Sequence, residues 1–245
     1  LMFWSSAALS LRQKIPLLRL RQSQQVWEAD LVGKTMIKVC GLSDPAHVRT
    51  AVEAGADYIG FVFYEPSPRS ISTMVAQGLA TLARGRARIV ALVVDADDEL
   101  IDRINTEVKP DFFLVHGSER ADRIAEIRGR TGVPVIKVIK VREASDIEAA
   151  SAYDEVEEMV LFDAKAPEAL VNALPGGNGI PFDWSLLSRD GAGKRFMLSG
   201  GLDASNVAEA IDITGAPEVD VSSGVETAPG VKDAAAIVKF IEAVR

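Results

Sequence analysis

The chain has 245 residues, of which 48% are hydrophobic, so it is long enough to bury the core of one large domain. Its formal net charge of −8 argues against nucleic-acid binding, which requires a basic surface. No apolar run approaches the roughly 20 residues that span a bilayer, and a single cysteine excludes an internal disulfide. With only two histidines and no CxxC motif, no metal site is expected either. We therefore expect a cytoplasmic globular protein without nucleic-acid or membrane partners.

Residues 1–35 differ in composition from the rest of the chain. They are apolar at the start and then basic, with five Lys or Arg residues against two acids. This order is the reverse of a secretory signal peptide. We interpret residues 1–35 as an N-terminal extension, disordered or loosely helical, or as a misassigned start upstream of Met36. A transit peptide is the alternative.

From Met36 onward, eight apolar, β-branched runs alternate with amphipathic stretches. The runs are residues 37–40, 58–63, 89–94, 112–115, 135–139, 159–162, 195–198 and 219–221. Helices are expected to begin near Asp44-Pro45, Ser72, Asp97, Ser118, Glu143, Asp203 and Lys232-Asp233. Such alternation predicts repeated βα units and a parallel sheet buried on both faces. The number of units favours a single (β/α)₈ TIM barrel over residues 36–245. A doubly wound sheet is the rival, but no GxGxxG motif follows the first run.

The lone cysteine, Cys40, closes the first predicted strand. Side chains alternate along a strand, so Lys38 and Cys40 are expected to point the same way. A thiolate is a useful base, and a neighbouring lysine favours the thiolate. At the end of a barrel strand, Cys40 is therefore placed for catalysis. A buried, unreactive cysteine is the alternative interpretation.

Asp163 closes the sixth predicted strand. A buried carboxyl must be hydrogen-bonded or poised as an acid, and in the second case it can donate a proton during catalysis. A carboxylate that merely caps a loop or helix is the alternative. The segment that follows, residues 164–181, is rich in Gly and Pro and is predicted to be a functional loop, followed by a short helix near Phe182.

Small residues follow the seventh and eighth predicted strands, at Ser199-Gly200-Gly201 and Ser222-Ser223-Gly224. In (β/α)₈ barrels, the loops at these two positions commonly bind phosphate. Simple turns are the alternative. Arg69 lies in a proline-flanked loop after the second strand and suits a carboxylate ligand, although a solvated arginine fits equally well. His116 follows the fourth strand, where it either lines the pocket or makes a structural hydrogen bond.

Several stretches occur together in one order along the chain: Lys38-Val39-Cys40-Gly41, Gly60-Phe61-Val62-Phe63, Ser67-Pro68-Arg69, Val115-His116-Gly117, Leu161-Phe162-Asp163, Gly176-Gly177-Asn178-Gly179, Phe182-Asp183-Trp184, Leu198-Ser199-Gly200-Gly201-Leu202 and Asp220-Val221-Ser222-Ser223-Gly224-Val225-Glu226. From Met36 to the C-terminus, the sequence closely resembles the phosphoribosylanthranilate isomerases of tryptophan biosynthesis. This joint order is specific, whereas no single stretch would suffice.

The resemblance implies an Amadori rearrangement of N-(5-phosphoribosyl)anthranilate, a sugar-phosphate substrate, without a cofactor and by a monomer or homodimer. It implies that Cys40 is the general base, Asp163 the general acid and Arg69 the ligand of the anthranilate carboxylate. Phosphate binding is implied for Gly200, Gly201, Ser223 and Gly224. Asp183 is implied near the sugar hydroxyls, and His116 is a further candidate substrate contact.

Two positions depart from the family pattern: Leu114 stands where Gln is frequent, and Asn178 stands where Thr is frequent. Both concern fine substrate contacts rather than the reaction class. Other functions on the same scaffold are a sugar-phosphate epimerase and a Schiff-base aldolase that uses Lys38 or Lys165. A non-catalytic barrel that only binds a sugar phosphate is the third alternative.

Overall fold

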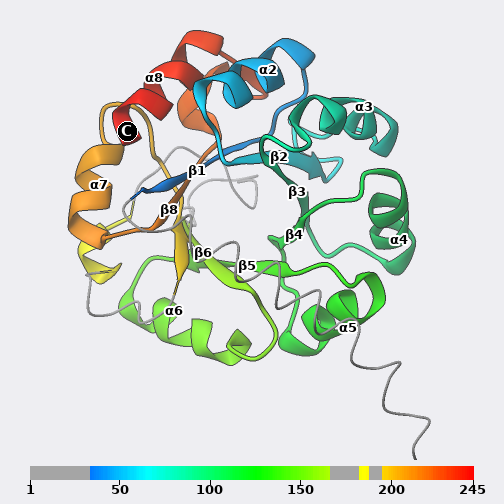
Figure 1. The fold of residues 1–245 in the computed structure, drawn as a ribbon. Helices are drawn as coiled ribbons and strands as arrows, with labels where there is room; N and C mark the ends of the chain where they lie inside the picture. The colour runs from blue at the N-terminus through cyan, green and yellow to red at the C-terminus, as the bar shows by residue number, and fades with distance from the viewer. Residues whose placement is uncertain (1–33, 166–181, 188–194) are drawn as a thin grey trace, which may run out of the picture. The chain divides into compact units, whose positions relative to one another are not determined.

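The computed structural model describes residues 34–165, 182–187 and 195–245. The chain divides into two units, Leu1–Lys34 and Thr35–Arg245. Within the described part of the second unit, eight parallel strands close into a barrel in chain order (Figure 1). They are β1 (Met36–Cys40), β2 (Tyr58–Phe63), β3 (Arg88–Val93), β4 (Phe112–Val115), β5 (Val135–Val141), β6 (Met159–Ala164), β7 (Phe196–Leu198) and β8 (Glu218–Val221). The predicted (β/α)₈ barrel is confirmed, and the open-sheet rival is wrong because β1 pairs with β8.

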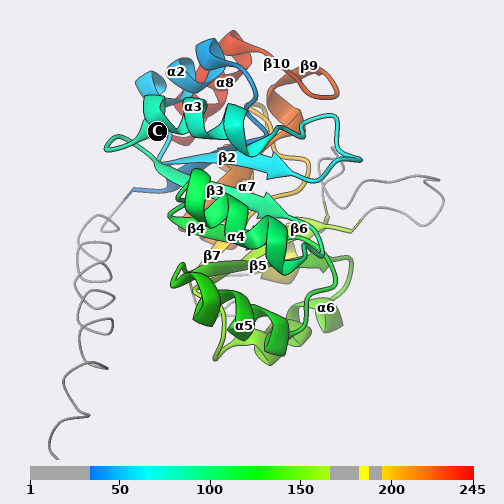
Figure 2. The same ribbon diagram turned by 90° about the vertical axis from the view of Figure 1, so that its right-hand side faces the viewer.

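Helices surround the strands on the outside of the barrel (Figures 1 and 2). They are α2 (Pro45–Ala54), α3 (Thr73–Ala83), α4 (Asp98–Glu107), α5 (Ala121–Thr131), α6 (Ala144–Glu148), α7 (Val207–Thr214) and α8 (Ala234–Val244). Short 3₁₀ turns lie at η1 (Ala149–Tyr153), η2 (Trp184–Leu187) and η3 (Ser223–Val225). The predicted short helix near Phe182 corresponds to η2.

Capping side chains begin several helices at the predicted residues. The carboxylates or hydroxyl of Asp44, Ser72, Asp97 and Asp233 each accept a hydrogen bond from a backbone N–H in the first turn. Such bonds satisfy donors that the helix itself leaves without partners. Local sequence therefore determines where these four helices start.

The predicted starts at Ser118 and Asp203 are wrong, because α5 and α7 begin three or more residues later. Ser118 donates from its backbone N and from Oγ to Asp95 Oδ1 on the neighbouring loop. Asp203 instead accepts from the backbone N and Oγ of Ser205, which forms a tight turn. Polar side chains thus hold both segments as loops before the helices begin.

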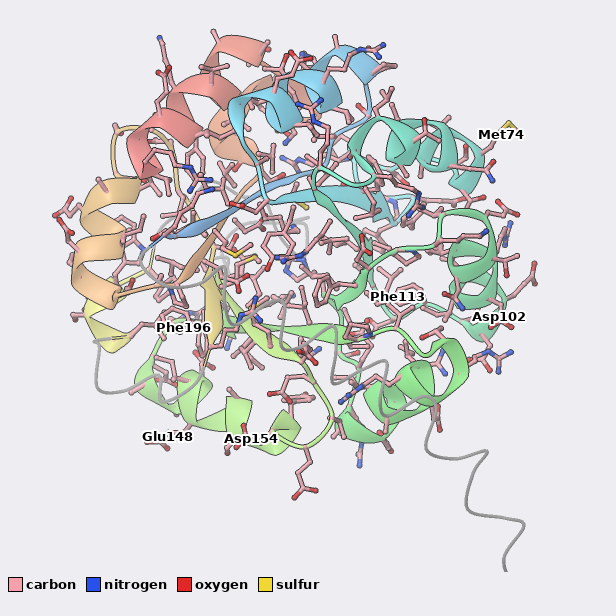
Figure 3. All side chains as sticks on the ribbon, viewed as in Figure 1. Met74, Asp102, Phe113, Glu148, Asp154 and Phe196 are labelled. Carbon is pink, nitrogen blue, oxygen red and sulfur yellow. The ribbon has the colours of Figure 1, made fainter. Side chains whose placement is uncertain are left out.

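The strands place alternate residues in two different environments. One set packs with the helices in the main hydrophobic core, for example Ile37 and Val39 of β1. Phe113 of β4 belongs to this core and lies inward of α4, whereas Met74 lies on the outer rim, 77% exposed (Figure 3). The other set, which includes Lys38 and Cys40, points into the barrel.

A cluster of charged and aromatic side chains fills the barrel where the strands begin. Buried Glu218 of β8 forms an ion pair with Arg195, which also donates a hydrogen bond to the hydroxyl of Tyr58. Arg88 lies over the Tyr58 ring, 5.3 Å from its centroid. Burial raises the pKa of Glu218, although the Arg195 guanidinium partly offsets this effect. Because active sites of such barrels lie at the opposite, carboxyl end of the strands, we assign this cluster to stability.

A short hairpin that the sequence analysis did not predict follows η3. It consists of β9 (Glu226–Ala228) and β10 (Val231–Lys232), which pair antiparallel. The intervening Gly230 has φ +83°, a conformation that favours glycine. A Cβ at Gly230 would lie 2.6 Å from the Pro68 carbonyl oxygen, so the hairpin packs closely against the loop after β2.

Candidate active site

Cys40 lies at the carboxyl end of β1 and is buried. Its register partner on β2 is Gly60, and a Cβ on Gly60 would lie 2.9 Å from Cys40 Sγ and 3.2 Å from Lys38 Nζ. The thiol and the ammonium group therefore share the space that this glycine leaves open. The expectation that Lys38 and Cys40 point the same way is confirmed.

Lys38 is fully buried and forms an ion pair with Asp220 of β8, with 2.9 Å between Nζ and Oδ1. Burial alone would lower the pKa of Lys38, but Asp220 and Cys40 outweigh this effect and raise its pKa above the ordinary value. The raised pKa favours the ammonium form of Lys38 beside the thiol. Asp220 was not among the predicted site residues; its signal was a charged residue at the inward positions of an otherwise apolar strand.

Asp163 is the penultimate residue of β6 and is buried. Its Oδ1 accepts a hydrogen bond from the backbone N of Ala164 at 3.0 Å. Its Oδ2 lies 3.3 Å from Nε2 of His116, which follows β4. That nitrogen is buried without a hydrogen-bond partner among the described residues, since the contact with Asp163 lacks hydrogen-bond alignment. The structure thus brings two predicted site residues together.

Polar contacts connect the surroundings of Asp163 with those of Cys40. A Cβ on Gly200 would lie 3.1 Å from Asp163 Oδ1, which places the loop after β7 against the acid. In the same loop, Ser199 donates from Oγ to Asp220 Oδ2 at 3.3 Å. Asp220 in turn holds Lys38 beside Cys40. The predicted base and acid therefore lie at the same, carboxyl end of the barrel.

The two loops predicted to bind phosphate are in direct contact with each other. A Cβ on Gly224 would collide with the carbonyl oxygen of Leu202, so the two backbones approach as closely as glycine allows. Gly200 and Gly201 both have positive φ, at +91° and +66°. Ser223 begins η3 in the second of these two loops. Such loops can present N–H groups to an anion.

Arg69 is buried and lies across the end of β1. Its side-chain carbons pack on Gly41, where a Cβ would lie 2.7 Å from Arg69 Cδ. Its guanidinium makes a bidentate ion pair with Glu226, at 2.7 Å from Nε and 2.8 Å from Nη2. Arg69 is therefore an ordered arginine next to Cys40 and not a solvated surface residue. Glu226 was not among the predicted site residues.

Asp183 is exposed, and its carboxylate accepts two hydrogen bonds from Ser185 at the start of η2. These bonds lower its pKa. Its place near sugar hydroxyls stays a prediction. The loop was predicted to begin at residue 164, but Ala164 is the last residue of β6. The rest of that loop from residue 166 to 181, which contains Asn178, lies outside the described residues, as do residues 1–33 of the N-terminal extension.

Two cavities open near the carboxyl ends of β2 to β5 and share Tyr64, Val94 and Asp95. One has a volume of about 470 Å³, and its lining includes Tyr64, Asp95, His116, Lys137, Lys140 and Tyr153. Among the described residues, no group of three or more His, Cys, Asp or Glu side chains is arranged to hold a metal ion. The site consists of acid–base groups, cations and glycine-rich loops.

Comparison with known proteins identifies the family of this chain. The family model of N-(5'-phosphoribosyl)anthranilate isomerase matches residues 37–243. The chain belongs to this family. The resemblance seen in the sequence is therefore confirmed over nearly the whole barrel. The protein is accordingly an enzyme, an isomerase of tryptophan biosynthesis.

Relatives of known function include the N-(5'-phosphoribosyl)anthranilate isomerases of Rhizobium johnstonii and Brucella canis. They are 50% and 49% identical to the chain, each over 85% of this chain and 93% of the relative. Among solved structures, the isomerase of Thermotoga maritima superimposes with a TM-score of 0.76 at 35% identity, covering 86% of this chain and 98% of that one. A further isomerase structure, in complex with reduced 1-(o-carboxyphenylamino)-1-deoxyribulose 5-phosphate, gives a TM-score of 0.73 at 33% identity and covers 86% of this chain and 98% of that one. In the described part of the chain, we find no helix with the length and hydrophobicity that crossing a membrane requires.

Proposed function

We propose that this isomerase converts N-(5'-phosphoribosyl)anthranilate to 1-(2-carboxyphenylamino)-1-deoxyribulose 5-phosphate, with Asp163 as general acid and Cys40 as general base. The observation that carries the assignment is the placement of both residues at the carboxyl end of the barrel, linked through the loop after β7 and the Asp220–Lys38 pair. The solved family structure that contains a reduced product analogue supports this substrate.

Asp163 begins the reaction in this proposal. It donates a proton to the ring oxygen of the ribose, the bond between that oxygen and C1 breaks, and the nitrogen lone pair forms a C1=N iminium. His116 Nε2 lies 3.3 Å from Asp163 Oδ2, beside the carboxylate that remains. A positioned proton donor contributes on the order of 10²–10⁴ in rate.

Cys40 completes the rearrangement. Its thiolate removes the proton from C2, and the electron pair of that C–H bond moves toward the iminium to give an enolamine. Loss of the 2-hydroxyl proton and addition of a proton at C1 then give the ketone. The buried Lys38 ammonium lies beside the sulfur that takes this proton.

Anchors at the two ends of the substrate hold it between these groups. Arg69 is the proposed ligand of the anthranilate carboxylate, and the paired loops with Gly200, Gly201, Ser223 and Gly224 are the proposed phosphate site. Asp183 is the proposed contact of the sugar hydroxyls, and His116 is a further proposed contact. Two fixed ends restrict a flexible substrate to the geometry that proton transfer requires.

The test is an assay that follows loss of phosphoribosylanthranilate fluorescence and identifies the product. We expect Cys40→Ser and Asp163→Asn to fold and to lose at least about 10²-fold in kcat. Activity of Cys40→Ser near that of the wild type would refute the base assignment. A change in KM alone for Asp163→Asn would count against a proton donor.

The aldolase alternative finds little support in the described lysines. A Schiff base requires a neutral amine, whereas Lys38 is a buried ammonium group paired with Asp220. Lys165 is partly exposed and lies 3.6 Å from Asp146, away from the barrel interior. Borohydride treatment in the presence of substrate should therefore leave both lysines unmodified. Phosphate binding without turnover would instead favour a non-catalytic barrel.

We further propose that the protein works in the cytoplasm as a monomer or homodimer. A Thermotoga maritima relative is described as dimeric, and a structure of mutually generated monomers of it has been solved. Light scattering at several protein concentrations distinguishes the two states.

A further inference from the structure

The β9–β10 hairpin carries two buried charges that the proposed reaction does not use. Glu226, the first residue of β9, accepts hydrogen bonds from Arg69 at both carboxylate oxygens. Lys232, the last residue of β10, donates from Nζ to Glu226 Oε1 at 2.7 Å. All three side chains are at least nine-tenths buried. One carboxylate therefore lies between two cations.

Lys232 also reaches the loop proposed to bind phosphate. Its Nζ donates to the carbonyl oxygen of Ser222 at 2.8 Å and approaches Ser222 Oγ at 3.3 Å. Ser222 Oγ in turn donates to the carbonyl oxygen of Cys40 at 3.3 Å. We call Arg69, Glu226, Lys232 and Ser222 the hairpin bridge. This bridge connects the ends of β1, β2 and β8.

The charges in the hairpin bridge depend on one another. Burial would raise the pKa of Glu226, but Arg69 and Lys232 outweigh burial and lower it below its ordinary value. For Lys232, burial dominates and lowers the pKa, although Glu226 opposes this. Replacing buried ion pairs with apolar residues is often neutral for stability, so stability alone does not account for such an arrangement. The functional reason for this arrangement is that it fixes a cation and a loop relative to the thiol.

The backbone of the hairpin restricts the same parts. Gly230 donates from its N to Glu226 Oε2 at 3.2 Å, while its close contact with the Pro68 carbonyl holds the loop that carries Arg69. Glu226 thus has four polar contacts, counting both from Arg69. A carboxylate held in this way defines the plane of the guanidinium that it pairs with.

We propose that Glu226 and Lys232 are positioning residues: they fix the Arg69 guanidinium and the Ser222–Gly224 loop relative to Cys40, so that an aromatic carboxylate and a phosphate bind at a set distance. Glu226 acts on the carboxylate end through Arg69. Lys232 acts on both ends, because it contacts Glu226 and Ser222. The inference rests on the proposed roles of Arg69 and of the phosphate loops.

The experiment uses the full chain and two probes, anthranilate and inorganic phosphate, whose binding is measured by calorimetry. We expect Glu226→Gln to weaken anthranilate binding by about tenfold, the equivalent of about 1.4 kcal/mol, with little effect on phosphate. Lys232→Met should weaken both probes. With phosphoribosylanthranilate, KM should rise more than kcat falls in Glu226→Gln, because the proton-transfer groups are untouched.

Arg195→Met is a control for loss of a cation that pairs with a buried glutamate. Arg195 pairs with Glu218 and donates to the hydroxyl of Tyr58, as Lys232 pairs with Glu226 and donates to Ser222. It lies where the barrel strands begin, at the end opposite to the proposed site. We expect this variant to lose stability comparable to Lys232→Met without weaker binding of either probe.

Equal losses of probe binding in Arg195→Met and Lys232→Met would overturn the inference, because they would indicate a general effect of stability. Unchanged anthranilate binding in Glu226→Gln would also overturn it. If Lys232→Met does not fold, Lys232→Arg, which keeps the charge, replaces it. Lys232→Arg should bind anthranilate more tightly than Glu226→Gln does. A wild-type protein without turnover would refute the proposed function, while probe binding would still decide the role of the bridge.

Discussion

Lys38 Nζ lies 2.9 Å from Asp220 Oδ1 inside the barrel, and the two residues are register partners on neighbouring strands. Lys38 is 0% exposed. The pair therefore holds a positive charge in the barrel interior next to the lone thiol. An uncompensated charge at this place would be costly, so each member depends on the other.

Replacing Lys38 with Met should both destabilise the fold and reduce catalysis. The variant leaves the Asp220 carboxylate buried without its cation, and breaking a buried pair in this way costs about 3–5 kcal/mol. Urea unfolding measures this loss. The double variant Lys38→Met/Asp220→Asn should recover part of the stability but not the activity, because the thiol still lacks its ammonium neighbour. Recovery of full activity in the double variant would contradict a role for Lys38 beside Cys40.

Adding one methyl group at Gly60 should disturb the base directly. An alanine Cβ would lie 2.9 Å from Cys40 Sγ, so the sulfur must move. Because small displacements at a reaction centre are costly, we expect kcat to fall by at least about tenfold. Gly78→Ala is the control: Gly78 lies in α3 with nothing within 4 Å of its added Cβ. That change should leave kcat unchanged and stabilise the helix by up to about 1 kcal/mol.

His116→Asn distinguishes a substrate contact from an influence on the acid. The imidazole Nε2 faces Asp163 Oδ2 at 3.3 Å and has no hydrogen-bond partner among the described residues. We therefore expect kcat to fall by about tenfold or more, a part of the 10²–10⁴ that a positioned acid supplies. Steady-state kinetics that show a higher KM with unchanged kcat would assign His116 to substrate binding alone.

Stability at acid pH should depend in opposite ways on two buried glutamates. The lowered pKa of Glu226 means that its contribution is present above the pKa of about 4.5 of an unfolded chain and is lost as the pH falls through its folded pKa. The raised pKa of Glu218 has the reverse sign: its contribution is present below that value and is lost as the pH rises through its folded pKa. Melting temperatures measured from about pH 3 to about pH 7 report both effects.

Relative to the wild type, Glu226→Gln should lose less stability on acidification, and Glu218→Gln should lose more. Both variants are isosteric and remove one titrating group each. Identical pH profiles for the two variants would show that other carboxylates determine acid stability.

Local sequence patterns account for the strands and for most helix starts. Apolar runs predicted all eight barrel strands to within two residues at every end, because both faces of a parallel strand are buried. Capping residues such as Asp44 and Asp97 fixed helix starts because their hydrogen bonds are made within three residues. At Ser118 the prediction failed because its side chain bonds to Asp95, a residue 23 positions away.

The residues of the candidate site also fall into those that the sequence predicted and those that it did not. Cys40, Asp163, Arg69 and the two glycine-rich loops were recognisable from residue type, position after a strand and family resemblance. Asp220, Glu226 and Lys232 were not predicted. The signal for Asp220 was its charge at an inward position of a strand, whereas charges in a Gly- and Pro-containing segment, as for Glu226 and Lys232, have no distinctive local pattern.

The sequence by itself therefore determined the barrel, the family and the identity of the proposed acid and base, because periodicity and short motifs are properties of neighbouring residues. Only the tertiary structure decided which charges meet: Lys38 with Asp220, Arg69 with Glu226, and His116 with Asp163. These partners are separated by 47 to 182 positions along the chain, and closure of the barrel through β1 and β8 brings the most distant of them together. Electrostatic contacts act over a few ångströms in space, so their partners follow from the fold and not from distance along the chain.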